Sequence, residues 1–151
     1  MGFRRAVPDD ATAMAEIEEL VFPDPWTKRD FSDLICEESG MCFSAIENGR
    51  VIAYVAGRLI APEAEIYRVA VRPEYQKRGI GYRLLDYAVK TSRGRGLEVI
   101  FLEVRSRNRA AIALYSAYGF EVASVRRGYY KNPDDDALIM IKASRADILD
   151  I

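Results

Sequence analysis

The spacing of apolar residues divides the chain into two kinds of segment. Short segments of alternating or consecutive apolar residues are typical of strands, whereas apolar residues every three or four positions are typical of amphipathic helices. The predicted strands cover residues 3–7, 42–47, 51–59, 65–71, 99–105, 121–127 and 137–142. The predicted helices cover residues 10–21, 28–38, 76–93 and 108–118, and the first should bury Ala13, Ile17, Leu20 and Val21.

The order of these elements predicts how the strands pair. Asn48-Gly49 joins two of the strands with a strong short-range hairpin signal, which indicates antiparallel neighbours. Between residues 65 and 105, a strand, a helix and a strand follow one another, which predicts one parallel pair with a right-handed crossover. We therefore expect an α/β fold in a single domain, residues 1–151, with a mixed, mostly antiparallel sheet and flanking helices.

Composition and charge narrow the classes of function. Lys plus Arg number 22 and Asp plus Glu 23, for a net charge of -1, which disfavours a direct nucleic-acid binder. No apolar run approaches the ~20 residues of a membrane span, and residues 1–10 lack the apolar core of a signal peptide, so we expect a cytoplasmic protein without membrane contact. The chain has no histidine, which excludes the common zinc sites and His-activated nucleophiles. We expect no metal, and a general base must be Glu, Asp, Lys, Tyr or a water held by one of them.

The carboxyl ends of the two parallel strands are the place where a ligand is expected in such a sheet. These ends are Val69–Val71 and Glu103–Arg105, and the segment Gln76–Gly81 follows the first of them. Its two glycines would let a ligand approach the backbone, and the free N–H groups of a helix start attract anions, so a diphosphate fits there. The alternative is an ordinary turn in which Lys77 and Arg78 are simply solvated, and the spacing alone leaves both open.

Two side chains near this edge are candidates for acid–base chemistry. Glu103 stands among the apolar residues of its strand, where a carboxylate is costly unless it is paired or used. The alternative for Glu103 is a structural ion pair, with Arg68 or Arg105 as the partner. Tyr115 lies on the next helix, on the same side as other apolar residues, so it is either a packing aromatic or a proton donor.

Two motifs resemble those of the GNAT family of N-acetyltransferases. The coenzyme A signature of that family reads Gln or Arg, two residues, Gly, one residue, Gly or Ala, and it is matched by Gln76–Gly81. The second motif is matched by Asn108, Ala111, Leu114, Tyr115, Gly119 and Phe120. Both motifs occur in order and at the right separation, and the resemblance covers residues 3–142.

Three further segments narrow the resemblance. Phe22–Thr27, Leu102–Arg105 and Arg126–Tyr130 are similar to segments of the bacterial ribosomal-protein-alanine N-acetyltransferases, and also of the archaeal protein N-terminal acetyltransferases. The chain departs from the bacterial pattern at Gly128, where that pattern often has Asn, and in the acidic run Asp134–Asp136. Both departures fall in the loop expected on the acceptor side, so they leave the identity of the acceptor open.

The resemblance implies a sheet with one splayed parallel pair of strands. It also implies which residues take part in catalysis and which contact the coenzyme. It implies acetyl-CoA as the co-substrate, Glu103 as the general base and Tyr115 as the general acid. The residues that would contact the coenzyme are Val69, Ala70, Val71, Gln76, Lys77, Arg78, Gly79, Ile80, Gly81, Asn108 and Tyr115.

The resemblance also implies that the acceptor is the N-terminal α-amino group of a protein or peptide, and a ribosomal small-subunit protein is one candidate. Two aromatic segments favour an open groove for an extended peptide end, although their aromatic residues could instead be core residues. The residues that would contact the acceptor are Phe22, Pro25, Trp26, Tyr129 and Tyr130. A small-molecule amine acetyltransferase and a catalytically silent coenzyme A-binding regulator remain alternatives, and the sequence does not indicate an oligomeric state.

Overall fold

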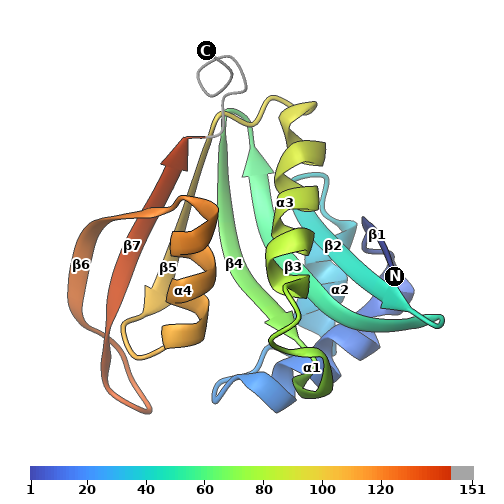
Figure 1. Ribbon diagram of the computed structural model, residues 1–151, viewed down its shortest axis with the longest axis horizontal. Coiled ribbons are helices and arrows are strands. Elements are labelled where there is room, and N and C mark those ends of the chain that lie inside the picture. The colour runs from blue at the N-terminus through green and yellow to red at the C-terminus, as the bar shows by residue number, and fades with distance from the viewer. Residues whose placement is uncertain (144–151) are drawn as a thin grey trace.

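The computed structural model describes residues 1–143, which form a seven-stranded sheet with helices on both faces (Figure 1). The C-terminal end of the predicted domain, residues 144–151, lies outside the described residues. The strands are β1 (Gly2–Arg5), β2 (Gly40–Glu47), β3 (Arg50–Ile60), β4 (Glu63–Val71), β5 (Val99–Arg105), β6 (Glu121–Tyr130) and β7 (Asp135–Ala143), in the order β1-β2-β3-β4-β5-β7-β6. The helices are α1 (Ala11–Val21), α2 (Lys28–Cys36), α3 (Ile80–Arg93) and α4 (Arg109–Tyr118).

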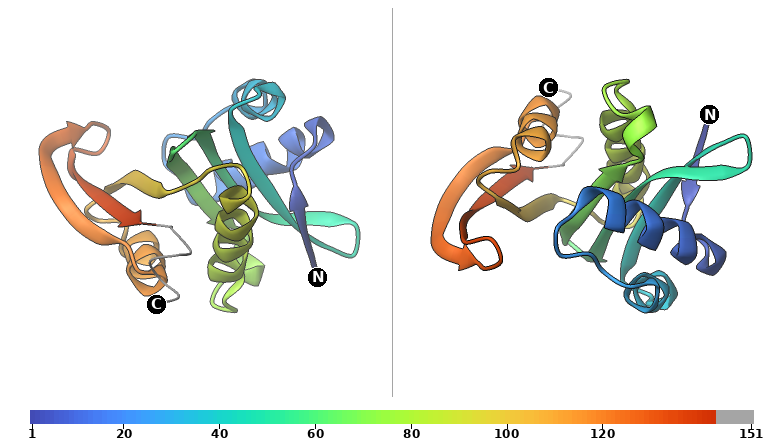
Figure 2. Two further views of the ribbon diagram at one scale, coloured as in Figure 1. Left: turned by 90° about the horizontal axis from the view of Figure 1, so that it is seen from above. Right: turned by 90° about the horizontal axis from the view of Figure 1, so that it is seen from below.

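The helices lie in two layers that bury two separate apolar clusters. Helices α3 and α4 lie on one face of the sheet and α1 and α2 on the other, as both views in Figure 2 show. Under α3 and α4 the core contains Leu84, Leu85 and Ile100, all fully buried. Under α1 and α2 it contains Ile17 and Phe31, also fully buried. Removal of this apolar surface from water makes the main favourable contribution to the free energy that holds the helices against the sheet.

The parallel pair that the sequence predicts is β4 and β5, and α3 is the crossover between them. Their pairing begins at Glu63 and Val99 and ends at Ile66 and Leu102. Beyond that point the two strands separate toward their carboxyl ends, as Figure 1 shows. All other neighbouring strands are antiparallel, so the predicted mixed sheet with one splayed parallel pair is confirmed.

A β-bulge interrupts β4 where the strands begin to separate. In the pairing with β3, Gly57 lies opposite Ile66 and Ala56 lies opposite Arg68, so Tyr67 is the extra residue. A Cβ atom at Gly57 would lie 2.4 Å from the carbonyl oxygen of Glu65, which leaves room only for glycine. The bulge lets both Tyr67 and Arg68 face the layer of α1 and α2, because it breaks the alternation of side chains along the strand.

Several predicted boundaries differ from the observed ones, but only two are wrong by more than two residues, and a left-handed glycine lies at each of these. Helix α3 begins at Ile80 and not at Gln76, because Gly79 has φ +75° and cannot continue a right-handed helix backward. Strand β6 runs to Tyr130, so the connection to β7 is only residues 131–134 and not Gly128–Asp136. Gly128 has φ +63° and its N–H donates to the Asp136 carboxylate at 2.8 Å, which ties β6 to β7 where the register of the pair shifts.

The buried face of α1 also differs from the predicted one. Leu20 is 59% exposed, whereas Met14 and Glu18 are fully buried. The helix is therefore rotated so that a carboxylate, and not a leucine, points into the protein. No helix within residues 1–143 has both the length and the apolar character needed to cross a membrane.

Candidate active site

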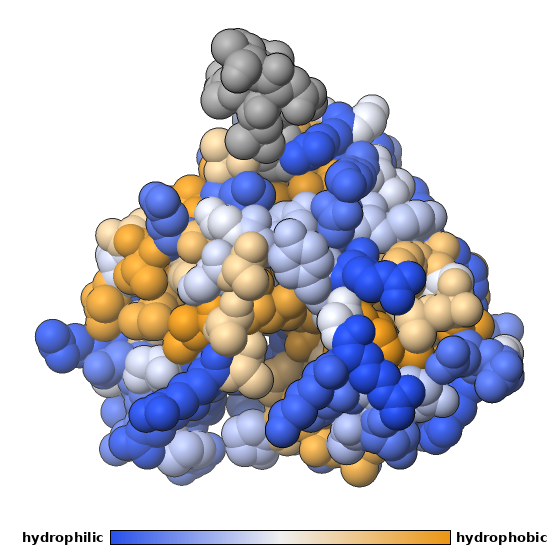
Figure 3. Space-filling model, viewed as in Figure 1, coloured by the Kyte–Doolittle hydropathy of each residue, from blue (hydrophilic) through white to orange (hydrophobic). Residues whose placement is uncertain are grey.

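The separation of β4 and β5 opens a hollow of about 640 Å³ at their carboxyl ends. Figure 3 shows the surface hollowed between α4 and the start of α3. The walls come from the α1–α2 loop, β4, the segment after β4, β5, the start of α4 and the β6–β7 connection. Residues far apart in the sequence thus meet at the one edge of the sheet where a parallel pair ends, which is where ligands bind in open α/β sheets.

Four of the residues predicted to contact the coenzyme line this hollow: Val69, Gln76, Asn108 and Tyr115. Gln76 donates from Nε2 to the carbonyl oxygen of Val71 at 3.0 Å. Asn108 caps α4, since its Oδ1 accepts a hydrogen bond from the N–H of Ala111 at 3.1 Å. These contacts hold Gln76 and Asn108 at the edges of the hollow.

The other predicted coenzyme residues lie around the rim or behind it. Ala70 is buried in the core under α1 and α2, so only its backbone could take part. Val71 and Ile80 pack in the core under α3. Arg78 donates to the carbonyl oxygen of Glu74 at 3.0 Å and stands over the Tyr75 ring, so its side chain is held locally.

The start of α3 is shaped by two residues with left-handed backbone. Lys77 has φ +63° and Gly79, the N-cap residue, has φ +75°. Because Gly79 has no side chain to cap the helix, the N–H groups of the first turn stay available to an anion. No protein atom lies within 4 Å of the place where a Gly79 Cβ would sit, and a Gly81 Cβ would make only ordinary contact with Leu114 at 3.5 Å. Space for a ligand at this helix start is therefore open.

Glu103 lies on β5 and lines the hollow. Its side chain keeps 27% of its exposure, so the carboxylate is only partly removed from water. Its ion-pair partner is Arg126 of β6, and Arg126 Nη1 lies 3.3 Å from Glu103 Oε1. The partner is therefore not Arg68 or Arg105, the two that the sequence suggested. A hydrogen bond to Glu103 also raises the pKa of Tyr129. The carboxylate thus has an ion-pair partner and still faces the hollow.

Tyr115 lies on α4, on the opposite wall. Its ring is 4% exposed and packs edge-on against Phe120, with ring centroids 5.6 Å apart, so it is a packing aromatic as well as a lining residue. Burial raises the pKa of Tyr115, and the charge of Arg68 offsets part of that rise. The hydroxyl group is accordingly protonated at neutral pH.

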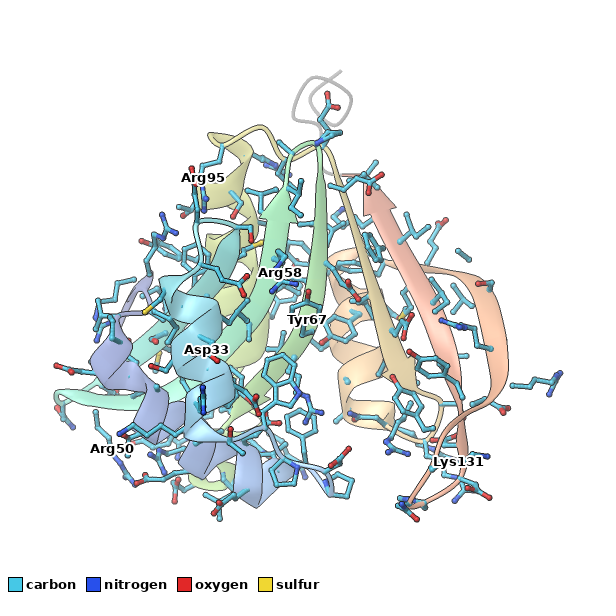
Figure 4. All side chains as sticks on the ribbon, turned by 180° about the vertical axis from the view of Figure 1, so that it is seen from behind. Asp33, Arg50, Arg58, Tyr67, Arg95 and Lys131 are labelled. Carbon is cyan, nitrogen blue, oxygen red and sulfur yellow. The ribbon has the colours of Figure 1, made fainter. Side chains whose placement is uncertain are left out.

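The aromatic residues predicted to contact the acceptor divide into two groups. Phe22 and Tyr130 line the hollow from opposite sides. Trp26 packs against Phe31 and Tyr67 in the cluster under α2 and lines a neighbouring hollow, so it also serves as a core residue. Tyr67, which Figure 4 labels, lines both hollows. Tyr129 is 44% exposed and stacks edge-on with Tyr130, and the lining residues include neither Tyr129 nor Pro25.

Sequence reasoning missed a buried carboxylate and its cation beside this hollow. Glu18 of α1 accepts hydrogen bonds from the Tyr54 hydroxyl, the Trp26 N–H at 2.9 Å and the Arg68 guanidinium. Its position one residue after Ile17 and four after Met14 places it on the buried face of α1, and that spacing was the available signal.

Asp135, the middle residue of the acidic run Asp134–Asp136, also lines the hollow. The Asp135 carboxylate accepts hydrogen bonds from the Ser106 hydroxyl and from the backbone N–H of Arg107 at 3.1 Å. These bonds tie the β6–β7 connection to the β5–α4 turn, and Asp135 itself is only 8% exposed. A run of three acidic residues gives no sequence signal that its middle member is buried.

Comparisons with known proteins agree with this geometry. A family model described as the acetyltransferase (GNAT) family matches residues 11–120. The chain is 36% identical over 133 residues to the [ribosomal protein bS18]-alanine N-acetyltransferase of Escherichia coli, covering 87% of this chain and 89% of that protein. The crystal structure of the ribosomal-protein-S18-alanine N-acetyltransferase from E. coli superposes with a TM-score of 0.87 and 32% identity, over 95% of this chain and 93% of that one.

Two other relatives extend the comparison. The N-alpha-acetyltransferase RimI of Mycobacterium tuberculosis is 36% identical over 141 residues, covering 89% of this chain and 87% of that protein. The crystal structure of Ard1 from Thermoplasma volcanium has a TM-score of 0.87 and 25% identity, over 95% of this chain and 97% of that one. The likeness therefore spans nearly the whole described chain.

Asp135→Asn should weaken the β6–β7 connection in a pH-dependent way. The hydrogen bond from Ser106 holds the pKa of Asp135 below its usual value of 3.8. A carboxyl whose pKa is lowered by folding stabilises the protein above its unfolded pKa, and that contribution is lost as the pH falls through the folded value. The wild type should therefore be more stable than Asp135→Asn at pH 7, and the difference should shrink below pH 3.8. Thermal midpoints measured from pH 2 to 7 test this, with Asp134→Asn as the neighbouring exposed control; a difference independent of pH would contradict it.

Proposed function

The chain belongs to the GNAT family of acetyltransferases, and from that membership we propose that it transfers the acetyl group of acetyl-CoA to the N-terminal α-amino group of a protein. A ribosomal small-subunit protein that begins with Ala is the first candidate, because the E. coli relative is named for that acceptor. The observation that carries the proposal is that Glu103 of β5 and Tyr115 of α4 line one hollow from different elements.

The residues around the hollow fit acetyl-CoA. The open helix start at Gly79–Gly81, with Lys77 and Arg78 beside it, suits the diphosphate. Beyond Ile66, β4 no longer pairs with β5, so its backbone there can hold the pantetheine arm around Val69, although the Val71 carbonyl oxygen already accepts a hydrogen bond from Gln76. Acetyl-CoA supplies the activated acetyl group, and the protein needs no nucleophile of its own because the acceptor amine attacks the thioester.

Glu103 serves as the general base. A free α-amino group has a pKa of ~7.7–8.0, so most of it carries a proton at pH 7 and cannot attack. Glu103 takes that proton, directly or through a water, from its position in the lining of the hollow, where it also pairs with Arg126.

Tyr115 serves as the general acid. Its buried hydroxyl is protonated at neutral pH, since burial raises its pKa. It gives its proton to the departing thiolate, whose sulfur would otherwise leave as an anion in a partly apolar hollow. The positive charge of Arg68 opposes the rise in the Tyr115 pKa and so makes the proton easier to give.

The acceptor enters between Phe22 and Tyr130, which border the hollow on opposite sides. An opening bordered by two loops suits the extended end of a peptide chain, and the aromatic rings give contact area at low entropic cost. On this proposal the protein acts in the cytoplasm, where ribosomal proteins are made, as a single N-acetyltransferase domain.

The test of the proposed function is a panel of acceptors. We expect peptides that begin with Ala to be acetylated faster than the same peptides with a blocked α-amino group, since only a free amine can attack. Mass spectrometry of the products identifies the acetylated amine, and peptides beginning with Ser or Met measure the breadth of the specificity. Transfer to small amines but to no peptide would instead support a small-molecule acetyltransferase, and coenzyme binding without any transfer would support a silent regulator.

Glu103→Gln should slow transfer at pH 7 by ~10²–10⁴-fold, the usual contribution of a placed base. The amide keeps the shape of the carboxylate but cannot accept the proton. The loss should shrink above pH 9, where the acceptor amine is already neutral. Rates are to be measured from pH 6 to 10 alongside the thermal midpoint. A variant that loses stability but keeps its rate would show that Glu103 serves only its ion pair with Arg126.

Tyr115→Phe should lower turnover by about 10²-fold, because the thiolate would leave without a proton donor. The ring remains, so the packing on Phe120 and the affinity for acetyl-CoA should be preserved. Turnover and calorimetric coenzyme binding on the same preparation separate the two effects. Wild-type turnover in this variant would make Tyr115 a packing residue only.

A further inference from the structure

Two arginines hold the two loops that border the acceptor entrance, and they do so in the same way. Arg68 lies on β4 and Arg105 on β5, both past the point where these strands stop pairing. Each donates to backbone carbonyl oxygens of a loop, and each guanidinium lies 4.4 Å from the centroid of an aromatic ring that lines the hollow. We propose that Arg68 and Arg105 are a matched pair of positioning residues that set the width of the acceptor groove; the proposal rests on the proposed function.

Arg68 holds the α1–α2 loop. Its Nη2 donates to the carbonyl oxygen of Asp24 at 3.2 Å, and its guanidinium lies over the rings of Phe22 at 4.4 Å and Trp26 at 5.3 Å. Nη1 of the same guanidinium pairs with Glu18. One side chain therefore fixes both the backbone and the aromatic residues of this loop.

Glu18 keeps Arg68 in place. The Glu18 carboxylate is fully buried and also accepts the Trp26 N–H and the Tyr54 hydroxyl, so it joins α1, β3, β4 and the loop. A buried carboxylate without such partners would be strongly destabilising, so the partners cannot move independently. The bulge at Tyr67 is what turns Arg68 to this side of β4.

Arg105 holds the β6–β7 connection on the other side. Nη1 donates to the carbonyl oxygen of Pro133 at 2.8 Å and Nη2 to that of Lys131 at 3.2 Å, and the guanidinium lies over the Tyr130 ring at 4.4 Å. Figure 4 labels Lys131 at the tip of this connection. Asp135 adds a second anchor through Ser106 and the Arg107 N–H.

Both positions use the specific geometry of arginine. A planar guanidinium can donate along its edge to carbonyl oxygens while its face stacks on an aromatic ring, and a lysine ammonium cannot do both. Loops that are ordered in advance do not have to be ordered by the acceptor, which would otherwise weaken its binding. Arg68 and Arg105 thus act on acceptor binding through Phe22 and Tyr130. Arg68 also brings a positive charge near Tyr115, so a test of its positioning role must keep a cation at this position.

The experiment compares Arg68→Lys and Arg105→Met with wild type by hydrogen exchange and by kinetics. Arg68→Lys is chosen because it keeps a cation against the buried Glu18, so the fold is retained. In Arg68→Lys, hydrogen exchange should become faster in residues 22–26 but not in residues 131–134. In Arg105→Met, it should become faster in residues 131–134 but not in residues 22–26. The KM for the Ala-peptide should rise on the order of tenfold in each, the scale expected when binding must order a few side chains. Acetyl-CoA affinity and the shape of the pH–rate profile should stay as in wild type.

Arg4→Met is the matched control. Arg4 also forms an ion pair, with Asp10 at 2.6 Å, but it lies on β1 at the far edge of the sheet. This variant should lose stability without changing exchange in either loop or the peptide KM. Unchanged loop exchange in Arg68→Lys and Arg105→Met, or loss of coenzyme affinity equal to the loss of peptide affinity, would overturn the proposal. Because hydrogen exchange needs no acceptor, a wild type that acetylates no peptide would refute the proposed function and leave the loop test intact.

Discussion

The end of the pairing between β4 and β5 is the constraint on which the rest of the site depends. Parallel strands need a crossover helix, and α3 supplies it, so the proposed coenzyme loop at the start of α3 and the end of β5 come to the same edge. Past Ile66 and Leu102 the strands separate, and the space between them is the hollow. A sheet with continuous pairing would satisfy every backbone group and leave no site there.

The second constraint is the buried carboxylate of Glu18. A charge removed from water must be compensated by partners close at hand, and Glu18 finds them in Arg68, Tyr54 and the Trp26 N–H. The cost of burying the pair is large, and hydrophobic residues of similar size could stabilise the fold as well. What the pair adds is a fixed position for the α1–α2 loop, because Glu18 accepts the Trp26 N–H and Arg68 donates to the Asp24 carbonyl oxygen. The same side chain of Arg68 also brings a positive charge near Tyr115.

Different surroundings separate the roles of the two proposed proton-transfer groups. Glu103 is partly exposed, pairs with Arg126 and lines the hollow, so its carboxylate can reach an acceptor amine or a water there. Tyr115 is buried against Phe120, a setting that favours its neutral form as a donor. Glu103 lies on strand β5 and Tyr115 on helix α4. The surroundings of each side chain are therefore determined by a different element.

The sequence by itself determined the elements, their order, the parallel crossover and the segments Gln76–Gly81 and Asn108–Tyr115, because apolar periodicity, turn residues and short motifs are local properties. It determined the ends of α3 and β6 less well, since the left-handed conformations of Gly79 and Gly128 are set by their surroundings. Tertiary structure alone decided that Arg126 is the partner of Glu103, that Glu18 and not Leu20 faces inward, and that Asp135 is an anchor. The physical reason is that each of these depends on contacts between residues at least 20 positions apart, and the partner of a charge cannot be read from its neighbours in the chain.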